Sequence, residues 1–298
     1  GLPGVIDRRL QPRWTLVARD AFSGVLLWKR AMPEWGWRQW KKMPAKQKGW
    51  ARMHAHRLRS PAVLPRRMVA SGDRLYVTCG FEEPLSVLNA ATGEKIRTVE
   101  NTKCADEIIH ADGLVLACIR EVPATGFTRN LGESPPERVA VIRPGTGETA
   151  WEVKEKRILP LTLAACGGRV YYHDYEELVC LDLQTGEELW RKKSMARKGA
   201  AGRFSEWFAG HTLVAREDVV LFSVPPEVKA YQADTGKLLW KSGGAGGPQS
   251  DAPDLFVIDG LAWFGGPKRN WNMRNPQEVL AKGLQGTIIT KRGHDLRT

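Results

Sequence analysis

The chain has 298 residues, of which 42% are hydrophobic and 26% are charged, as is typical of a globular protein. No apolar run reaches about 18 residues, so no transmembrane helix is predicted, and no signal peptide is expected within residues 1–10. The net charge of +12 favours an anionic partner, although a generally basic surface explains the charge equally well. The five cysteines form no C-x-x-C pair, and their odd number excludes complete internal pairing.

The first predicted element is a β-hairpin at residues 14–30. An apolar strand leads to Asp20, the pair Ser23-Gly24 follows, and a second strand ends at Trp28. Asp and Ser side chains bond to nearby backbone amides, and glycine adopts a positive φ at little cost. This sequence therefore predicts two antiparallel strands joined by a tight turn.

A basic, tryptophan-rich insertion follows at residues 31–64. Six of its residues are candidates for binding a partner: Trp35, Trp37, Arg38, Trp40, Lys41 and Trp50. Aromatic rings interleaved with positive charges suit an anionic polymer, through stacking and charge, or a carbohydrate. The alternative is an excursion whose tryptophans pack on the fold while its lysines face water. His54 and His56 have no third ligand nearby, so no metal site is predicted.

Four further segments each contain two strand pairs, at about residues 65–99, 106–154, 161–193 and 210–242. In each segment a pair with its own glycine turn precedes a hairpin like the first one, which gives four antiparallel strands. Residues 121–137 and 242–250 are expected to be loops. After a last strand pair at 255–265, a short helical turn is expected near residues 277–284.

The hairpins share one phrase, whose turn glycines are Gly24, Gly93, Gly147, Gly186 and Gly236. They recur at intervals of 39 to 69 residues, a range that the blades of β-propellers occupy when loop length varies. The sequence thus predicts an all-β propeller of four-stranded antiparallel blades. We expect residues 1–298 to form a single domain that begins and ends inside a blade. It would hold about four complete and two partial blades of a ring of about six to eight.

The phrase A-x-D-x-x-[ST]-G-x-x-x-W resembles the tryptophan-docking repeat of quinoprotein-like (PQQ-repeat) β-propellers. That family includes outer-membrane assembly lipoproteins and quinone-dependent alcohol dehydrogenases. Residues 18–28 match the phrase fully, and the other copies carry substitutions, the largest being Arg97 in place of tryptophan. We call this last residue of the phrase the docking position. The resemblance implies that indoles there wedge neighbouring blades together, at Trp28, Trp151, Trp190 and Trp240. It also implies a periplasmic or extracellular location.

Polar residues gather at the predicted starts of the innermost strands, where propellers often bind ligands in a central funnel. They are Arg66, Arg67, Asp106, Glu107, Thr162, His211, Asp251 and Asp254. Such a lining could hold a small polar ligand or a cation. The alternative is that these are ordinary residues at loop ends, solvated or capping turns.

The resemblance leaves three functions open. Quinone-dependent relatives use PQQ with calcium, a catalytic Asp and often an adjacent cysteine pair, and this sequence has no adjacent cysteines. We therefore favour a non-catalytic scaffold that presents loops to a protein or an anionic polysaccharide, with no cofactor and no catalytic residues. The alternatives are a partial or degenerate PQQ-dependent oxidoreductase and a nucleic-acid-binding propeller.

Overall fold

The structure is a computed structural model, and it describes residues 15–34, 66–80, 82–121, 135–194, 211–224, 227–243, 254–266, 278–283 and 288–289. Strands dominate these residues, with a short 3-10 helix at Glu100–Thr102. Within the same residues, no helix is long and apolar enough to cross a membrane. The chain divides into two compact units, which we describe separately.

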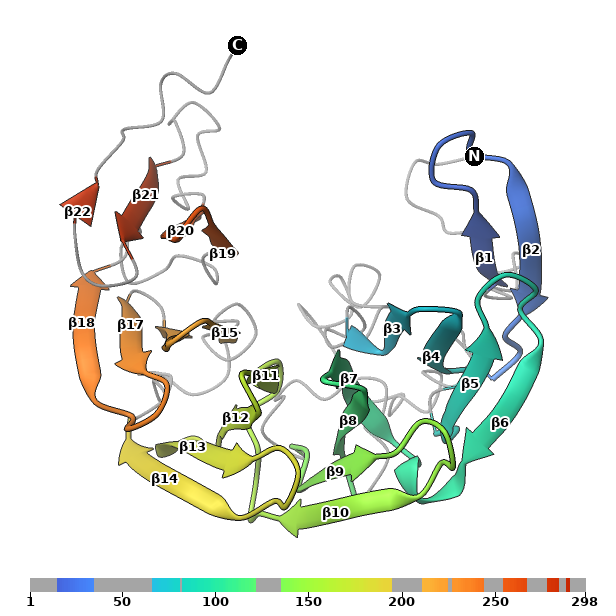
Figure 1. The fold of residues 1–298 in the computed structure, drawn as a ribbon, viewed down its shortest axis with the longest axis horizontal. Coiled ribbons are helices and arrows are strands. Elements are labelled where there is room, and N and C mark those ends of the chain that lie inside the picture. The colour runs from blue at the N-terminus through green and yellow to red at the C-terminus, as the bar shows by residue number, and fades with distance from the viewer. Residues whose placement is uncertain are drawn as a thin grey trace, which may run out of the picture. The chain divides into compact units, whose positions relative to one another are not determined.

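Unit 1 comprises residues 1–128 and 136–154 and contains three antiparallel sheets (Figure 1). The first is the hairpin of β1 (Thr15–Arg19) and β2 (Leu26–Ala31). The second has the order β3 (Met68–Ser71), β4 (Arg74–Thr78), β5 (Leu85–Asn89) and β6 (Lys95–Val99). The third has the order β7 (Ala105–Ala111), β8 (Leu114–Ile119), β9 (Arg138–Ile142) and β10 (Thr149–Lys154).

Unit 2 comprises residues 129–135 and 155–298 and contains three four-stranded sheets. The first is β11 (Ala164–Cys166), β12 (Arg169–His173), β13 (Glu177–Asp182) and β14 (Glu188–Lys193). The second is β15 (Thr212–Arg216), β16 (Val219–Val224), β17 (Glu227–Gln232) and β18 (Leu238–Gly243). The third is β19 (Asp254–Ile258), β20 (Leu261–Gly266), β21 (Glu278–Gly283) and β22 (Ile288–Ile289).

Within each unit, neighbouring four-stranded sheets contact one another through their first strands. β3 contacts β7 in unit 1, while in unit 2 β15 contacts both β11 and β19. Buried apolar side chains of neighbouring sheets share one hydrophobic cluster, which includes Val87 and Ile108 in unit 1 and Tyr171 and Phe222 in unit 2. Four-stranded meanders packed in this way are the blades of a β-propeller. The predicted fold class is confirmed.

A β-bulge recurs in five hairpins, one residue before the docking position. In the first hairpin Ala18 pairs with Trp28 and Arg19 pairs with Leu26, which leaves Leu27 without a partner residue. The same skip occurs between β5 and β6, β9 and β10, β13 and β14, and β17 and β18. A bulge bends the strand and re-aims the side chain beside it. It therefore places the docking residue in the same way in each sheet.

Two docking tryptophans lie on the turn of the next sheet. The Trp28 indole N–H donates to the Ala90 carbonyl at 2.8 Å, and the Trp190 indole N–H donates to the Ala233 carbonyl at 3.0 Å. Each ring also lies against the turn glycine, because a methyl group at Gly93 or Gly236 would come within 2.7 Å of it. The turn glycine is thus needed twice, for its positive φ and for this close approach.

Arg97 takes the same place where the tryptophan is missing. Its side-chain carbon Cδ would lie 2.9 Å from a methyl group at Gly147, the turn glycine of the next sheet in unit 1. The aliphatic stem of an arginine can cover apolar surface while its guanidinium stays polar. The position therefore tolerates arginine, although with less buried area than an indole provides.

The tail differs from the sequence-based expectation. A helical turn was expected near residues 277–284, and this expectation is wrong, because residues 278–283 form strand β21, which pairs with β20. Without that partner one edge of β20 would leave its backbone groups unbonded. Together with β22, these strands complete the third four-stranded sheet of unit 2.

Candidate functional site

The polar residues predicted at the first-strand starts fall into two groups, one in each unit. In unit 1 the structure brings together Arg66, Arg67, Asp106 and Glu107. In unit 2 Thr162 bonds to His173, and His211 lies beside Phe222, on which the His173 ring stacks. For Asp254 the structure describes only the backbone, at the start of β19, and Asp251 lies outside the described residues. So do Trp35, Trp37, Arg38, Trp40, Lys41 and Trp50 of the insertion.

The group in unit 1 is a buried ion-pair cluster. Asp106 lies at a bulge near the start of β7 and is 1% exposed. Its two carboxylate oxygens accept hydrogen bonds from Arg67 and from Arg120, the residue that follows β8. The Arg66 guanidinium binds the adjacent Glu107 at 2.5 Å. Charges taken out of water are tolerated only when they are paired in this way.

Burial dominates the electrostatics of this cluster. The pKa of Arg67 is lowered to about 10 by the loss of hydration, which leaves the guanidinium charged at neutral pH. Burial also raises the pKa of the Cys104 thiol beside it, with a further contribution from the charge of Glu82. Cys104 is therefore a neutral thiol rather than a reactive thiolate.

In unit 2 the corresponding group is neutral and centres on His173, at the end of β12. The fully buried His173 ring contacts the Ser194 carbonyl through Nε2, and its Nδ1 accepts from the Tyr175 N–H at 3.0 Å. These contacts fix the tautomer with the proton on Nε2. The Thr162 hydroxyl accepts from the His173 N–H at 3.2 Å and donates to the Leu159 carbonyl at 2.6 Å.

Aromatic stacking joins this group to the next sheet of unit 2. The His173 ring stacks on Phe222 of β16 with the centroids 4.3 Å apart, and His211 lies 6.0 Å from Phe222 in a parallel orientation. Burial lowers the pKa of both histidines to about 4. The Ser194 hydroxyl and the Tyr231 hydroxyl are 2.7 Å apart and share a hydrogen bond between the two sheets.

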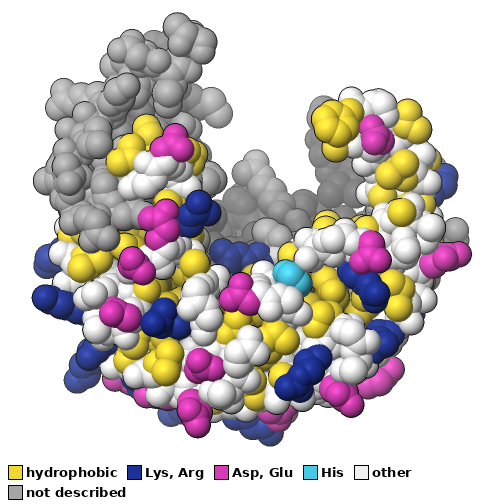
Figure 2. Space-filling view, in the orientation of Figure 1, with side chains coloured by type: hydrophobic (Ala, Val, Ile, Leu, Met, Phe, Trp, Pro, Cys, Tyr) yellow, Lys and Arg dark blue, Asp and Glu magenta, His cyan; other side chains and the backbone are white. Residues whose placement is uncertain are grey.

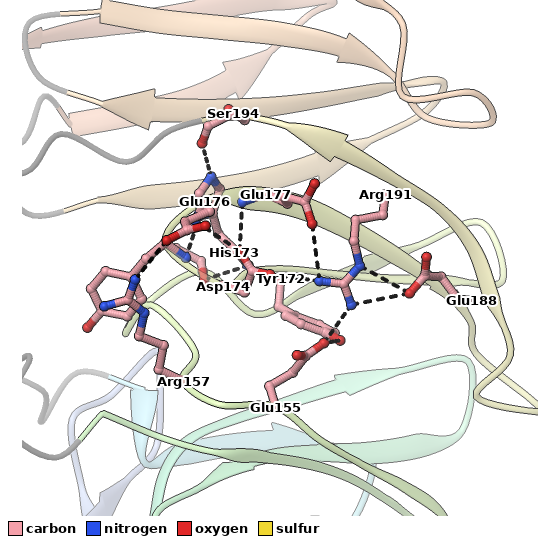
Figure 3. Close-up of polar contacts among 12 residues, drawn as sticks. Glu155, Arg157, Tyr172, His173, Asp174, Glu176, Glu177, Glu188, Arg191 and Ser194 are labelled. Atoms are coloured by element: carbon pink, nitrogen blue, oxygen red, sulfur yellow. Dashed lines mark hydrogen bonds and ion pairs between the residues drawn. The ribbon is translucent and has the colours of Figure 1, made fainter.

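A second polar network in unit 2 surrounds Arg191 on the outermost strand β14 (Figure 3). Its guanidinium lies within 4 Å of four carboxylates: Glu155 and Asp174 at 2.7 Å, Glu188 at 3.2 Å and Glu177 at 3.7 Å. Burial acts to lower the pKa of Arg191, but the hydrogen bond and charge of Glu155 outweigh it and raise the pKa above its usual value. The network ties the segment that enters the sheet to its last strand.

Sequence reasoning missed Arg120, His173 and Arg191. The first two follow a shared signal: a polar residue at the end of an otherwise apolar second strand, after Leu114–Ile119 and after Val170–Tyr172. A charged or polar group at the end of such a run needs a partner, which points to the neighbouring sheet. Arg191 gave no such signal, because alternating charges on an outer strand are usual.

The carboxylates of the cluster do not fit a calcium-bound quinone. Calcium takes about six to eight oxygen ligands, mostly from carboxylates and carbonyls that are free to turn toward the ion. Asp106 accepts from two guanidinium groups and Glu107 from a third. Among the described residues no group of three or more His, Cys, Asp or Glu side chains is arranged to hold a metal ion.

Comparison with known proteins agrees with this fold. The family model described as outer membrane protein assembly factor BamB matches residues 136–252. The crystal structure of BamB from Moraxella catarrhalis is similar with a TM-score of 0.53 and 17% identity, covering 93% of this chain and 66% of that one. The chain thus spans just under two thirds of that structure. A search of the curated proteins found no match.

Two other solved structures are similar at lower identity. The Pan2 WD40 domain of Neurospora crassa has a TM-score of 0.50 and 9% identity, covering 76% of this chain and 64% of that one. A quinohemoprotein alcohol dehydrogenase of Pseudomonas putida HK5 has a TM-score of 0.48 and 13% identity, covering 76% and 41%. At these identities the likeness concerns the fold alone. The match over residues 136–252, with the repeated hairpin phrase and the four-stranded sheets, confirms the resemblance to the PQQ-repeat β-propeller family.

Proposed function

We propose that this chain is a non-catalytic propeller scaffold that binds an acidic protein surface through its loops, above all through the insertion at residues 31–64. One observation carries the proposal. The acidic groups at the first-strand starts of unit 1 are held by arginines of the same chain, and Thr162 and His173 of unit 2 bond to each other. Such groups support the sheets, so recognition falls to the loops.

The charge distribution supports an acidic partner. The insertion contains eight basic residues and one acidic residue, Glu34, which gives it a net charge of +7 out of +12 for the whole chain. Tryptophan and arginine are the residues most often found at the energetic centre of protein interfaces. Four tryptophans among eight basic residues therefore suit a protein with a negative surface, while an anionic polysaccharide has the same charge.

The family match supports a role in protein binding in general terms. The matching model is that of an outer-membrane assembly factor. This resemblance supports the proposal that the chain works in the periplasm or outside the cell, and we propose that it uses no cofactor. Trp35, Trp37, Arg38, Trp40, Lys41 and Trp50 are the residues that we expect to touch the partner.

A site-specific photo-cross-linker tests the proposal. Placed at Trp37 in the full chain, it should give a discrete protein adduct in cells, and the adduct should disappear in the Arg38→Glu, Lys41→Glu variant. Trp37→Ala with Trp40→Ala should abolish the adduct formed from a cross-linker at Trp35 while leaving the melting temperature unchanged. The same cross-linker placed at exposed Ile258 serves as the control.

Three outcomes would count against the proposal. A large loss of stability in the double tryptophan variant would show that these rings belong to the core. Adducts with nucleic acid, and binding that falls steeply with salt, would favour the nucleic-acid alternative. Reduction of a dye that depends on added PQQ and calcium would favour the oxidoreductase.

A further inference from the structure

A short turn joins β12 and β13, the second and third strands of the first sheet in unit 2. His173 is the last residue of β12, and the Asp174 N–H donates to the Glu177 carbonyl at 3.0 Å, which closes the turn. Tyr175, the first of the two residues in between, has a φ of +81°. Turns of this length prefer glycine where φ is positive, because the side chain of another residue is strained there. Tyr175 therefore keeps this conformation only while its neighbours hold it.

The His173 ring is one of these neighbours. Its Nδ1 accepts a hydrogen bond from the Tyr175 N–H at 3.0 Å. Asp20, Asn89 and Asp182 hold other turns in the same way, through a side-chain oxygen that accepts from the N–H two residues on. Asparagine does not titrate, and backbone N–H groups keep the pKa of both aspartates below the usual value. An imidazole Nδ1, by contrast, becomes a donor when it takes up a proton. Acid can therefore remove the acceptor from the turn at His173 while these other turns keep theirs.

The remainder of the His173 ring is packed inside unit 2. Nε2 contacts the Ser194 carbonyl, and the ring stacks on Phe222 with the centroids 4.3 Å apart. Figure 2 shows Lys, Arg, Asp and Glu side chains on the surface, whereas His173 is fully buried. A proton on Nδ1 would place a buried positive charge opposite the Tyr175 N–H, donor against donor. The protonated ring is therefore stable only where the turn has opened and the ring reaches water.

The groups around the ring decide how it responds to acid. Burial has the largest effect and lowers the pKa of His173 to about 4. The charge of Asp174, which is itself paired with Arg191, acts to raise this pKa, whereas His211 before β15 and Lys229 of β17 act to lower it. A histidine in water titrates near 6.5. The ring thus takes up a proton more readily once the turn is open, so acid favours the open turn.

From this geometry we propose that His173 is an acid-sensitive switch of the turn at residues 174–176. Protonation of Nδ1 replaces the acceptor of the Tyr175 N–H by a donor. The N–H turns away, Tyr175 leaves the positive-φ region, and the ring moves toward water. The Ser194 carbonyl then loses its contact with Nε2, which loosens the end of β14. This inference does not depend on the proposed function.

Other contacts confine the opening to the turn. Asp174 Oδ1 accepts from the N–H groups of Glu176 and Glu177 at 2.9 and 2.6 Å, and these bonds keep the ends of the two strands together. The Arg157 guanidinium lies 4.7 Å above the Tyr175 ring and pairs with Glu176 at 3.2 Å. This ion pair is exposed to solvent and therefore weak, so it does not hold Tyr175 against the loss of the His173 bond.

Amide hydrogen exchange in the ¹⁵N-labelled full chain provides the test. Protection factors, which correct for the intrinsic pH dependence of exchange, are measured from pH 7 to pH 4.5. Protection of the Tyr175 N–H should fall by up to about tenfold for each pH unit below about 6.5, because the turn takes up one proton when it opens. The matched control is the Gln184 N–H, which donates to Asp182 at 2.8 Å and whose protection should stay constant.

Three variants assign the response to His173. In His173→Asn the side-chain oxygen can accept the N–H two residues on, as that of Asn89 does at 2.9 Å, but it does not titrate, so protection of the Tyr175 N–H should no longer depend on pH. Tyr175→Gly removes the strain of the closed turn and should raise protection of this amide at least about fivefold at every pH. His211→Gln removes the other buried histidine beside Phe222 and should leave the fall with pH in place.

Three results would overturn the proposal. The first is protection of the Tyr175 N–H that does not change between pH 7 and pH 4.5. The second is a fall that persists in His173→Asn or disappears in His211→Gln, because another group would then be the switch. The third is an equal fall at the Gln184 N–H, because the whole sheet would then be opening rather than the one turn.

Discussion

The two units stabilise the ends of their sheets with different chemistry. In unit 1 a buried aspartate, Asp106, lies between the two guanidinium groups of Arg67 and Arg120. In unit 2 the comparable buried group is His173, which is neutral, stacks on Phe222 and bonds to Ser194. The charged cluster depends on every partner being present, whereas the neutral one depends on remaining uncharged. The comparison shows that one repeat can place either kind of polar group at the ends of its second strands.

The largest loss of stability is expected when the negative charge of Asp106, at the centre of the unit 1 cluster, is removed. Asp106→Asn leaves two buried guanidinium groups without a counter-charge, and we expect the free energy of unfolding to fall by about 3–5 kcal/mol. Chemical denaturation of the variant measures this loss. Glu152→Gln, which weakens the more exposed pair with Arg138, should change stability by less than about 1 kcal/mol. Equal losses of stability in the two variants would contradict the expectation that the buried ion pairs of Asp106 stabilise the fold more than the exposed pair of Glu152 and Arg138.

Substitutions at the docking position test a contact that both units contain, the packing of this side chain on the turn of the next sheet. Trp190→Ala removes a ring that is 8% exposed and its hydrogen bond to Ala233, and it should cost about 3 kcal/mol. Arg97→Ala should cost less, because only an aliphatic stem lies on Gly147. Leu189→Ala, at the exposed bulge next to Trp190, is the matched control for denaturation. Equal destabilisation by Leu189→Ala and Trp190→Ala would show that the docking tryptophan has no special stabilising role.

Acid should distinguish unit 2 from unit 1. Burial holds the pKa of His173 near 4, while an unfolded histidine titrates near 6.5. As the pH falls below about 6.5, the unfolded state takes up a proton that the folded state cannot accept until about pH 4. His173 and His211, whose pKa is lowered equally, should therefore each make the free energy of unfolding fall by roughly 1.4 kcal/mol per pH unit across this window. Denaturation curves at pH 7 and pH 5 measure the change.

A glutamine variant provides the control for the acid experiment. His173→Gln keeps a polar group at the end of β12 but cannot titrate. Its stability at pH 7 should be lower than that of the parent, because Gln stacks poorly on Phe222, but the slope with pH should be flatter. A slope unchanged by the substitution would assign the acid sensitivity to other groups, with His211 as the first candidate.

The repeated hairpins show how far the sequence alone could lead. The interval between turn glycines, the Asp or Asn before three of them and the tryptophan after four of them identify four-stranded blades, because each feature has a local physical cause. The tail shows the limit. Residues 278–283 have no strand signal that separates them from a helical turn, and only the unbonded edge of β20 decides between the two. The predicted starts of the first strands located Arg66, Arg67, Asp106 and Glu107, but they did not predict that these charges pair with one another in a buried cluster.

By itself the sequence determined the class of fold, the repeat and the positions of the docking residues, because turn chemistry and alternating apolar residues act over a few positions along the chain. Only the tertiary structure decided which charges face one another, that Arg120 and His173 are each buried beside a polar partner, and that the rings of Trp28 and Trp190 lie on Gly93 and Gly236. Those facts depend on contacts between residues far apart in sequence. Such contacts form only when sheets pack together, and no local pattern encodes them.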